Sequence, residues 1–142
     1  MTELRVLTLN GTPLPEYATS GSVGLDLRAA EHITIPPKEW KIISTGLKFE
    51  VPENHEVQIR SRSGLAFKGI TVMNQPGTID TDFRGEIRVI LHNNNPSPWV
   101  VYKGDRIAQA VVSPVTHVEV RAVSDISVTS RGESGLGSTG ER

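Results

Sequence analysis

Short runs of Val, Ile and Thr, separated by Pro, Gly and Asn, are the feature that most constrains how this chain can fold. They recur as LRVLTL, HITI, WKIISTGLKF, HEVQIR, ITVM, EIRVIL, WVVY, AQAVV and HVEVRAV. In HEVQIR, apolar and polar residues alternate, so that Val57 and Ile59 share one face of the expected strand. Residues 116–122 alternate in the same way. Short strands spaced by turn residues predict an all-β sandwich, jelly roll or barrel.

Only one short stretch is typical of a helix, namely residues 63–69, SGLAFKG. We expect Ser63 to be its N-cap and Gly69 to end it after one or two turns. A helix N-terminus presents unpaired N–H groups and partial positive charge, so a turn that begins at Ser63 predicts a seat for phosphate. Arg62, just before it, adds a planar fork of donors that suits phosphate oxygens.

The bulk properties exclude several classes of function. The chain has 142 residues, enough for one domain, and its net charge of −1 gives no general attraction to nucleic acid or membranes. It has no cysteine and only 4 scattered histidines, which excludes a thiol nucleophile and a Cys-containing zinc site. No signal-like or membrane-spanning apolar segment is present. We therefore expect a cytoplasmic protein without membrane or stable nucleic-acid partners.

The last dozen residues differ in composition from the rest of the chain. Residues 135–140, GLGSTG, match the G-x-G-x-x-G string of dinucleotide sites, but only two residues follow, too few for the helix that such a site requires. We expect residues 1–128 to form the β domain and residues 129–142 to form a mobile C-terminal arm.

Two carboxylates stand close together in the segment GTIDTDFRG, residues 77–85. If this segment is extended, Asp80 and Asp82 share one face and Phe83 points the other way. Aspartates between glycines are also typical of turns, where their side chains bond to the backbone. A carboxylate held beside a phosphate could instead orient and deprotonate a water molecule.

Taken in order, five segments resemble the five motifs of the trimeric deoxyuridine triphosphatase (dUTPase) family. They are ATSGSVGLDLRA (18–29), RSGLA (62–66), GTIDTDFRG (77–85) with Asn74 upstream, GDRIAQ (104–109) and RGESGLGSTG (131–140). Each motif alone is weak, but their order and spacing make the combination specific. The resemblance implies an all-β, distorted jelly-roll or barrel-like fold with one short helix and a flexible Gly-rich arm. It also implies a homotrimer with shared active sites.

The same resemblance implies an enzyme, a dUTP diphosphatase. With Mg²⁺, it would hydrolyse dUTP to dUMP and pyrophosphate by attack of water at the α-phosphorus. This reaction limits uracil in DNA and supplies dUMP for thymidylate synthesis. Asp80 corresponds to the catalytic residue that positions and activates the water. Asp26 matches an acidic residue with an indirect role near the metal, which is bound mainly through substrate phosphates and water.

The resemblance also implies two sets of binding residues. The set for the substrate phosphates is Arg62, Ser63, Gly64, Gln109, Arg131, Ser138 and Thr139. The set for uracil and deoxyribose is Asn74, Gly77, Ile79, Phe83 and Leu136. Because a triphosphate brings about four negative charges to a nearly neutral protein, Mg²⁺, arginines and N–H groups must neutralise them locally.

Two of these positions depart from the family pattern. Phe83 replaces a usual Tyr and keeps the ring that excludes a ribose 2′-hydroxyl. Leu136 replaces an aromatic residue that stacks on uracil, and such stacking contributes roughly 1–3 kcal/mol per base. We therefore expect a functional arm that binds substrate more weakly or turns it over more slowly.

Two alternatives remain open at this point. One is a dCTP deaminase, a relative with the same fold that has Glu where Asp80 lies and lacks the Gly-rich fifth motif. The other is a dUTPase-like module that senses the nucleotide without efficient turnover, an interpretation that Leu136 keeps open.

Overall fold

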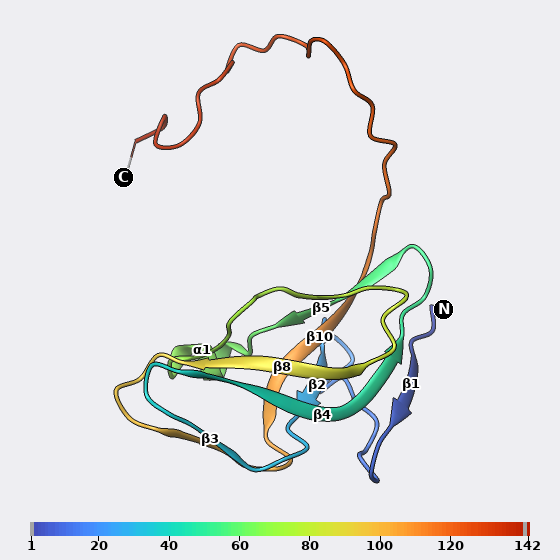
Figure 1. Ribbon diagram of the computed structural model, residues 1–142, viewed down its shortest axis with the longest axis vertical. Helices are drawn as coiled ribbons and strands as arrows, with labels where there is room; N and C mark the ends of the chain where they lie inside the picture. Colours follow the sequence, from blue (N-terminus) through green and yellow to red (C-terminus); the bar gives the residue numbers. More distant parts are fainter. Residues whose placement is uncertain (1, 141) are drawn as a thin grey trace.

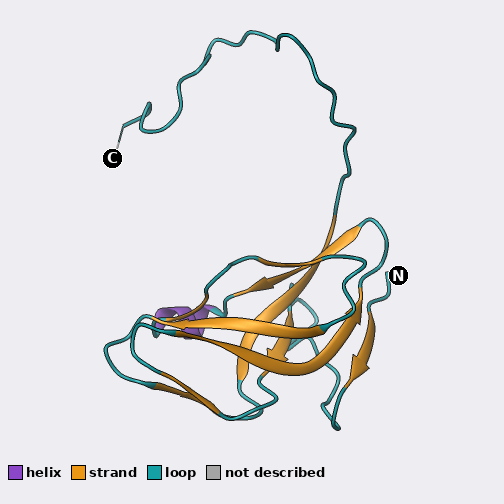
Figure 2. Ribbon diagram, in the orientation of Figure 1, coloured by secondary structure: helices purple, strands orange, loops and turns teal. Residues whose placement is uncertain are grey.

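The computed structural model describes residues 2–140 and 142 (Figures 1 and 2). These residues contain ten strands and one short helix, joined by loops. The strands are β1 (Arg5–Thr8), β2 (Leu25–Arg28), β3 (Ile33–Ile35), β4 (Trp40–Glu50), β5 (His55–Arg60), β6 (Ile70–Val72), β7 (Gly77–Ile79), β8 (Glu86–Asn93), β9 (Trp99–Val101) and β10 (Arg106–Pro114). The helix α1 is Ser63–Phe67. The expected all-β fold with one short helix is confirmed.

The strands form two four-stranded antiparallel sheets and one separate pair. The first sheet has the order β1-β4-β8-β6, the second has the order β2-β10-β5-β7, and β3 pairs with β9. Alternate residues of both main sheets enter one apolar core, as Ile43 and Phe49 do from β4 and Val57 and Ile59 do from β5. Val57 is 0 % exposed, in agreement with the face predicted from HEVQIR. The period-two pattern therefore determines which side of each sheet faces the core.

One buried amide joins the β3–β9 pair to the end of β8. Asn93 is 0 % exposed, and its side chain bonds to four backbone groups. Nδ2 donates to the carbonyls of Ile35 (3.0 Å), Pro36 (3.3 Å) and Ser97 (2.9 Å), and Oδ1 accepts from the N–H of Asn95 (2.9 Å). The Asn93 side chain therefore supplies the hydrogen bonds of backbone carbonyls at the end of β3 and before β9, and these buried polar groups all have a partner.

Helix α1 differs from the expectation at its first residue. Arg62 is the N-cap, with extended backbone angles and no side-chain cap, so the prediction that Ser63 caps the helix is wrong. The reason is that the Arg62 carbonyl already accepts the first helical bond, from the N–H of Ala66 at 2.9 Å. Gly69 ends the helix as expected, at a φ of 83°. Within residues 2–140 and 142, no helix has the length and apolar character needed to cross a membrane.

The chain beyond β10 extends away from the two sheets (Figure 1). Residues 116–140 are exposed throughout. The strand predicted from HVEVRAV is wrong for the single chain: residues 117–123 are not in a strand, and Val118 and Val120 are 75 % and 91 % exposed. A strand needs a neighbour to pair its N–H and C=O groups, and this segment lies against none in one chain.

Replacing Asn93 should destabilise the fold far more than replacing its neighbour. We expect Asn93→Ala to lower the free energy of unfolding by about 3 kcal/mol or more, because buried carbonyls lose their donors. Asn94→Ala removes an exposed amide that donates to the Gly69 carbonyl at 3.0 Å, and it should cost less than about 1 kcal/mol. Urea titration at fixed protein concentration measures both values. Equal losses for the two variants would contradict the role given to Asn93.

Candidate active site

A row of polar side chains crosses the outer face of the second sheet. Gln109 in β10 lies opposite Asp26 in β2 on one side and opposite Arg60 in β5 on the other. Its chain neighbours Ala108 and Ala110 are buried, so Gln109 faces away from the core. The register therefore brings the acidic residue of the first motif next to the glutamine of the fourth.

Gly24 allows this row to pack closely. A Cβ atom at this position would lie 2.9 Å from Cβ of Gln109 and 3.4 Å from Cγ2 of Val111. Real Cβ atoms do not approach another carbon this closely, so any side chain at position 24 would displace Gln109. The glycine of the first motif thus has a packing role that involves the fourth motif.

The phosphate residues predicted from the second motif lie at the same end of the sheet. Arg62 follows β5, and its Nη1 donates to the carbonyl of Arg106 at the start of β10 (3.0 Å). Ser63 and Gly64 are exposed at the start of α1. Their N–H groups precede the first helical bond, so they have no partner within the helix. This end of the sheet therefore presents several donors toward solvent.

The arginines here are oriented by neutral oxygens. Arg28, Arg62 and Arg106 line a cavity of about 390 Å³. Arg28 Nη1 donates to the carbonyl of Gly104 at 2.8 Å, as Arg62 does to that of Arg106. In the described part of the chain, the only arginines within 4.0 Å of a carboxylate are Arg5 and Arg84. A carbonyl fixes a guanidinium without cancelling its charge, so the three arginines outweigh Asp105, which also lines the cavity, and favour an anion there.

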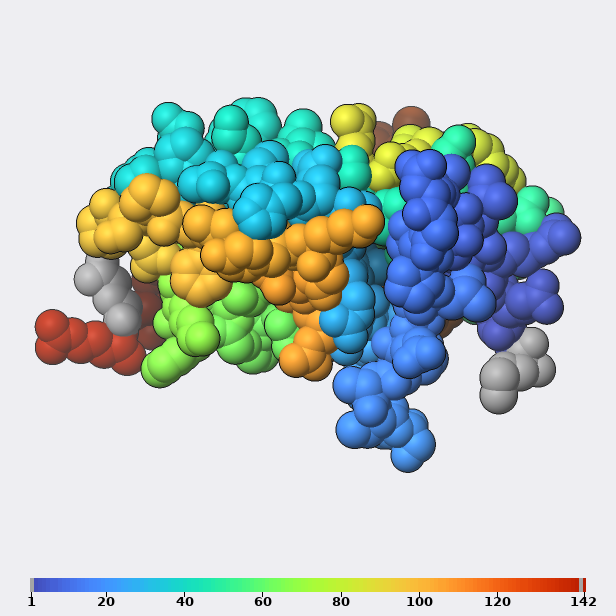
Figure 3. Space-filling model, turned by 90° about the horizontal axis from the view of Figure 1, so that it is seen from below, coloured from blue at the N-terminus to red at the C-terminus, as the bar shows by residue number. Residues whose placement is uncertain are grey.

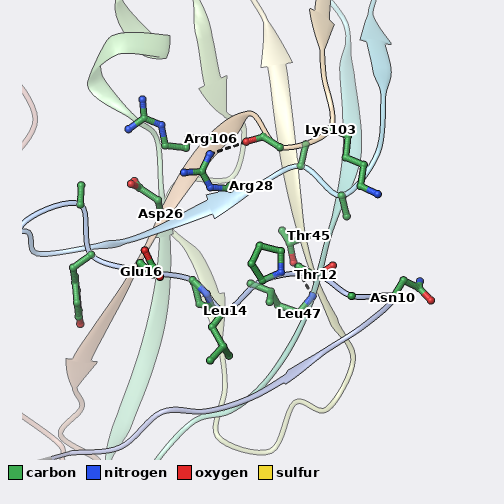
Figure 4. Close-up of a pocket in the computed structure, with 18 residues that line it drawn as sticks. Asn10, Thr12, Leu14, Glu16, Asp26, Arg28, Thr45, Leu47, Lys103 and Arg106 are labelled. Carbon is green, nitrogen blue, oxygen red and sulfur yellow. Dashed lines mark hydrogen bonds between the residues drawn. The ribbon is translucent and has the colours of Figure 1, made fainter.

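A second cavity, of about 490 Å³, lies beside the first (Figure 4). Residues 10–18 form one wall, and Asp26, Arg28, Lys103 and Arg106 lie on the other. In Figure 3, the blue N-terminal segment borders the orange segment that leads into β10, and the cavity lies between them. Arg28 and Arg106 belong to both cavities, and the sequence interpretation assigned neither a role, because no spacing rule points to them.

Three of the residues predicted to contact uracil and deoxyribose, namely Asn74, Gly77 and Ile79, lie on β7 or just before it. A Cβ atom on Gly77 would lie 3.2 Å from Cβ of Ile59 and 3.5 Å from Nδ2 of Asn74. The loop before β7 is attached to the end of β5, because the N–H of Ser61 donates to Oε1 of Gln75. This hydrogen bond fixes the position of the loop that carries Asn74.

Asp80 and Phe83 lie just after β7 and are both exposed. The strand ends at Ile79, and the Phe83 N–H donates to the Asp80 carbonyl at 3.3 Å. The segment therefore turns at residues 81–82 instead of remaining extended, so it does not keep Asp80 and Asp82 on one strand face. The Phe83 ring covers Gly85, where a Cβ atom would lie 2.6 Å from Cζ.

Asp80 is far from the phosphate residues of the same chain. Val57 pairs with Ile79, so Asp80 continues the register opposite Glu56, at the start of β5. Arg62 follows the other end of β5, six residues later. Six extended residues span about 20 Å. One chain therefore does not bring Asp80 to Arg62 and Ser63.

The arm residues stand apart from both groups. Arg131, Leu136, Ser138 and Thr139 are exposed, and Leu136 has 109 % relative exposure. Arg131 Nε donates to the Ser134 carbonyl at 2.8 Å, within the arm itself. The structure thus divides the predicted site residues into three groups: those at the start of β10, those around β7 and those in the arm.

Comparisons with known proteins all lead to one family. A family model described as dUTPase matches residues 10–140. The deoxyuridine 5'-triphosphate nucleotidohydrolase of Anaplasma marginale (strain St. Maries) is 51 % identical over 140 residues, which cover 96 % of this chain and 95 % of that protein. The enzyme of that name from Nautilia profundicola is 50 % identical over 141 residues, with 98 % and 99 % covered. The solved structure of Staphylococcus bacteriophage 80alpha dUTPase with dUPNHPP has a TM-score of 0.91 at 26 % identity and covers 99 % of this chain and 100 % of that one.

The contact beneath Gln109 can be tested with two glycines of the first motif. We expect Gly24→Ala to lower the free energy of unfolding by about 1–3 kcal/mol through overpacking and to shift the side-chain amide NMR signal of Gln109. Nothing lies within 4 Å of a Cβ atom at Gly21. Gly21→Ala should therefore leave both quantities nearly unchanged. An unshifted Gln109 signal in Gly24→Ala would contradict the close packing.

Proposed function

Because the chain belongs to the dUTPase family, whose members are hydrolases acting on dUTP, we propose that it hydrolyses dUTP to dUMP and pyrophosphate with Mg²⁺, at sites shared between subunits of a homotrimer. The observation that carries this proposal is the division of the site residues within one chain. Donors suited to phosphate lie at one end of β5, and the carboxylate of Asp80 lies opposite the other end. A second copy of the chain is needed to join them.

The triphosphate would bind to the donors around the start of β10. Arg62 offers a guanidinium that no carboxylate of the described residues neutralises. Ser63 and Gly64 offer backbone N–H groups that have no helical partner, and Gln109 adds an amide on the outer face of the sheet. These groups stabilise charge without forming a covalent bond, which is what phosphoryl transfer mainly requires of a protein.

Asp80 would act as the general base. Its carboxylate is exposed after β7, next to the segment that would hold the nucleoside. A carboxylate can hold a water molecule in line with the α-phosphorus and accept its proton as the new P–O bond forms. Pyrophosphate then leaves from the opposite side of the phosphorus, and dUMP remains. No nucleophilic side chain is required.

The nucleoside would bind along β7. The Asn74 amide and the backbone of Gly77 and Ile79 offer donors and acceptors to the edge of uracil. Gly77 is buried opposite Ile59, and a Cβ atom there would lie 3.2 Å from Cβ of Ile59, so the lack of a side chain lets β7 and the loop with Asn74 pack closely on β5. The Phe83 ring would lie against the deoxyribose and leave no room for a 2′-hydroxyl.

A metal carried by the substrate fits the residues present. Among residues 2–140 and 142, no group of three or more His, Asp or Glu side chains could hold an ion alone. Asp26 is half-buried beside Gln109 and could bind water ligands of Mg²⁺. When bound, Mg²⁺ offsets charge on the phosphate oxygens.

The arm would close the site from a neighbouring subunit. Residues 116–140, which include the described arm up to residue 140, are exposed, and before the arm Val118 and Val120 are apolar and alternate with polar residues. Residues 116–122 would pair with a strand of another copy and carry the arm across the interface. Arg131, Ser138 and Thr139 would then contact the phosphates, and Leu136 would cover uracil.

Phosphorus NMR tests the reaction directly. The purified chain with Mg²⁺ and a panel of nucleoside triphosphates should release pyrophosphate and dUMP from dUTP alone. Asp80→Asn should lower kcat by at least about 100-fold, because it keeps the side-chain shape but removes the base. Formation of dUTP from dCTP would indicate a deaminase, and binding without products would indicate a sensor.

If each site is shared between two subunits, two inactive variants should regain activity when their chains are mixed in one trimer. Arg62→Ala and Asp80→Asn each remove one half of the site. When the two chains are unfolded together and refolded in equal amounts, about a quarter of the interfaces combine an intact Arg62 with an intact Asp80. The mixture should then recover about that fraction of wild-type activity. If one chain supplied both residues, every site would contain a defect and the mixture would stay inactive.

A further inference from the structure

The turn before β10 and the first residue of β10 each accept a hydrogen bond from an arginine elsewhere in the second sheet or just after it. Arg28, at the end of β2, donates from Nη1 to the carbonyl of Gly104 at 2.8 Å. Arg62, after β5, donates from Nη1 to the carbonyl of Arg106 at 3.0 Å. The two acceptors are only two residues apart. A shift of this turn caused by one arginine would therefore move the acceptor of the other.

The β2–β10 ladder reaches this turn through the pair Arg28–Arg106, but the ladder is irregular immediately beyond that pair. The register between β10 and β2 shifts between Arg106 and Ala108. Such an irregularity leaves backbone groups unpaired and allows the chain to bend. On the β2 side, the backbone of Ala29 exchanges two bonds with the turn: its N–H donates to the Asp105 carbonyl, and its carbonyl accepts from the Gly104 N–H, both at 2.8 Å. The Arg28 side chain adds its bond to Gly104 to these backbone contacts and to the backbone pairing of Arg28 with Arg106.

We propose that Arg28 is a positioning residue for Arg62. By holding the Gly104 carbonyl, Arg28 fixes the turn that leads into β10, where the Arg106 carbonyl orients the Arg62 guanidinium toward the substrate phosphates. This proposal rests on the proposed function, in which Arg62 binds the triphosphate. A long side chain without such an anchor samples several rotamers, and binding must then order it.

The chemistry of its acceptor indicates that Arg28 positions Arg62 and contributes little to the stability of the fold. Arg28 is exposed, and its partner is a neutral carbonyl in an exposed turn, so loss of the bond exposes both groups to water at little cost. The effect should therefore appear in phosphate binding and not in the melting temperature. The guanidinium charge of Arg62 stays available, because the anchor at Arg106 is neutral as well.

A double-mutant cycle tests the proposal. The measured quantity is the Kd of dUpNHpp, the analogue bound by the bacteriophage 80alpha enzyme, for wild type, Arg28→Met, Arg62→Met and the double variant. Arg28→Met should weaken binding by about fivefold, on the order of one lost hydrogen bond. In the Arg62→Met background, the same change should have no further effect. Arg28→Lys, which can still donate to Gly104, should recover part of the loss.

Controls distinguish a failure of the Arg28 proposal from a failure of the proposed function. Arg5→Met removes an exposed strand arginine that pairs with Glu50 at 2.8 Å, and it should leave the Kd unchanged. Deoxyuridine has no phosphate, so its inhibition of dUTP hydrolysis should be equally strong for wild type and for Arg28→Met. An undiminished effect of Arg28→Met in the Arg62→Met background would overturn the proposal, since Arg28 would then act on phosphate directly. If wild type does not bind dUpNHpp, the proposed function fails instead.

Discussion

The double pairing of β10 is the constraint on which the rest of the site depends. This strand bonds to β2 on one edge and to β5 on the other, so it fixes Gln109 between Asp26 and Arg60. The pairing of β5 with β7 then sets the distance between the phosphate donors and the carboxylate of Asp80. Residues far apart in the sequence thus become neighbours through one register, and a slip of one residue would turn Gln109 toward the core.

Charge is distributed around this strand in a way that favours anions. The protein as a whole is nearly neutral, with a net charge of −1. Arg28 and Arg62 nevertheless bond to carbonyls, whereas Arg5 and Arg84 pair with Glu50 elsewhere on the surface. The guanidinium groups of Arg28 and Arg62 are therefore oriented beside β10 by oxygens that carry no charge. In the proposed function, this local positive charge would attract the triphosphate, although the net charge of the chain is close to zero.

The sequence predicts most of the strands but little of what positions the site. The alternation in HEVQIR is sufficient to predict the buried face of β5, because burial enforces a period of two. The same alternation at residues 117–123 gives no strand, since pairing depends on a partner that one chain lacks. β2 and β7 lie within glycine-containing motifs and carry a weak strand signal. The bond from Arg28 to Gly104 spans 76 residues, and no local pattern could indicate it.

Assembly is therefore part of the chemistry in this proposal. With Asp80 and Arg62 about 20 Å apart along β5, a folded single chain has both functional groups but no complete site. Val118 and Val120 are exposed in the single chain, so a contact between copies that buries them would gain apolar burial and also complete the site. Any substitution that weakens the interface should then lower activity before it unfolds the sheets, because the core between them lies within one chain.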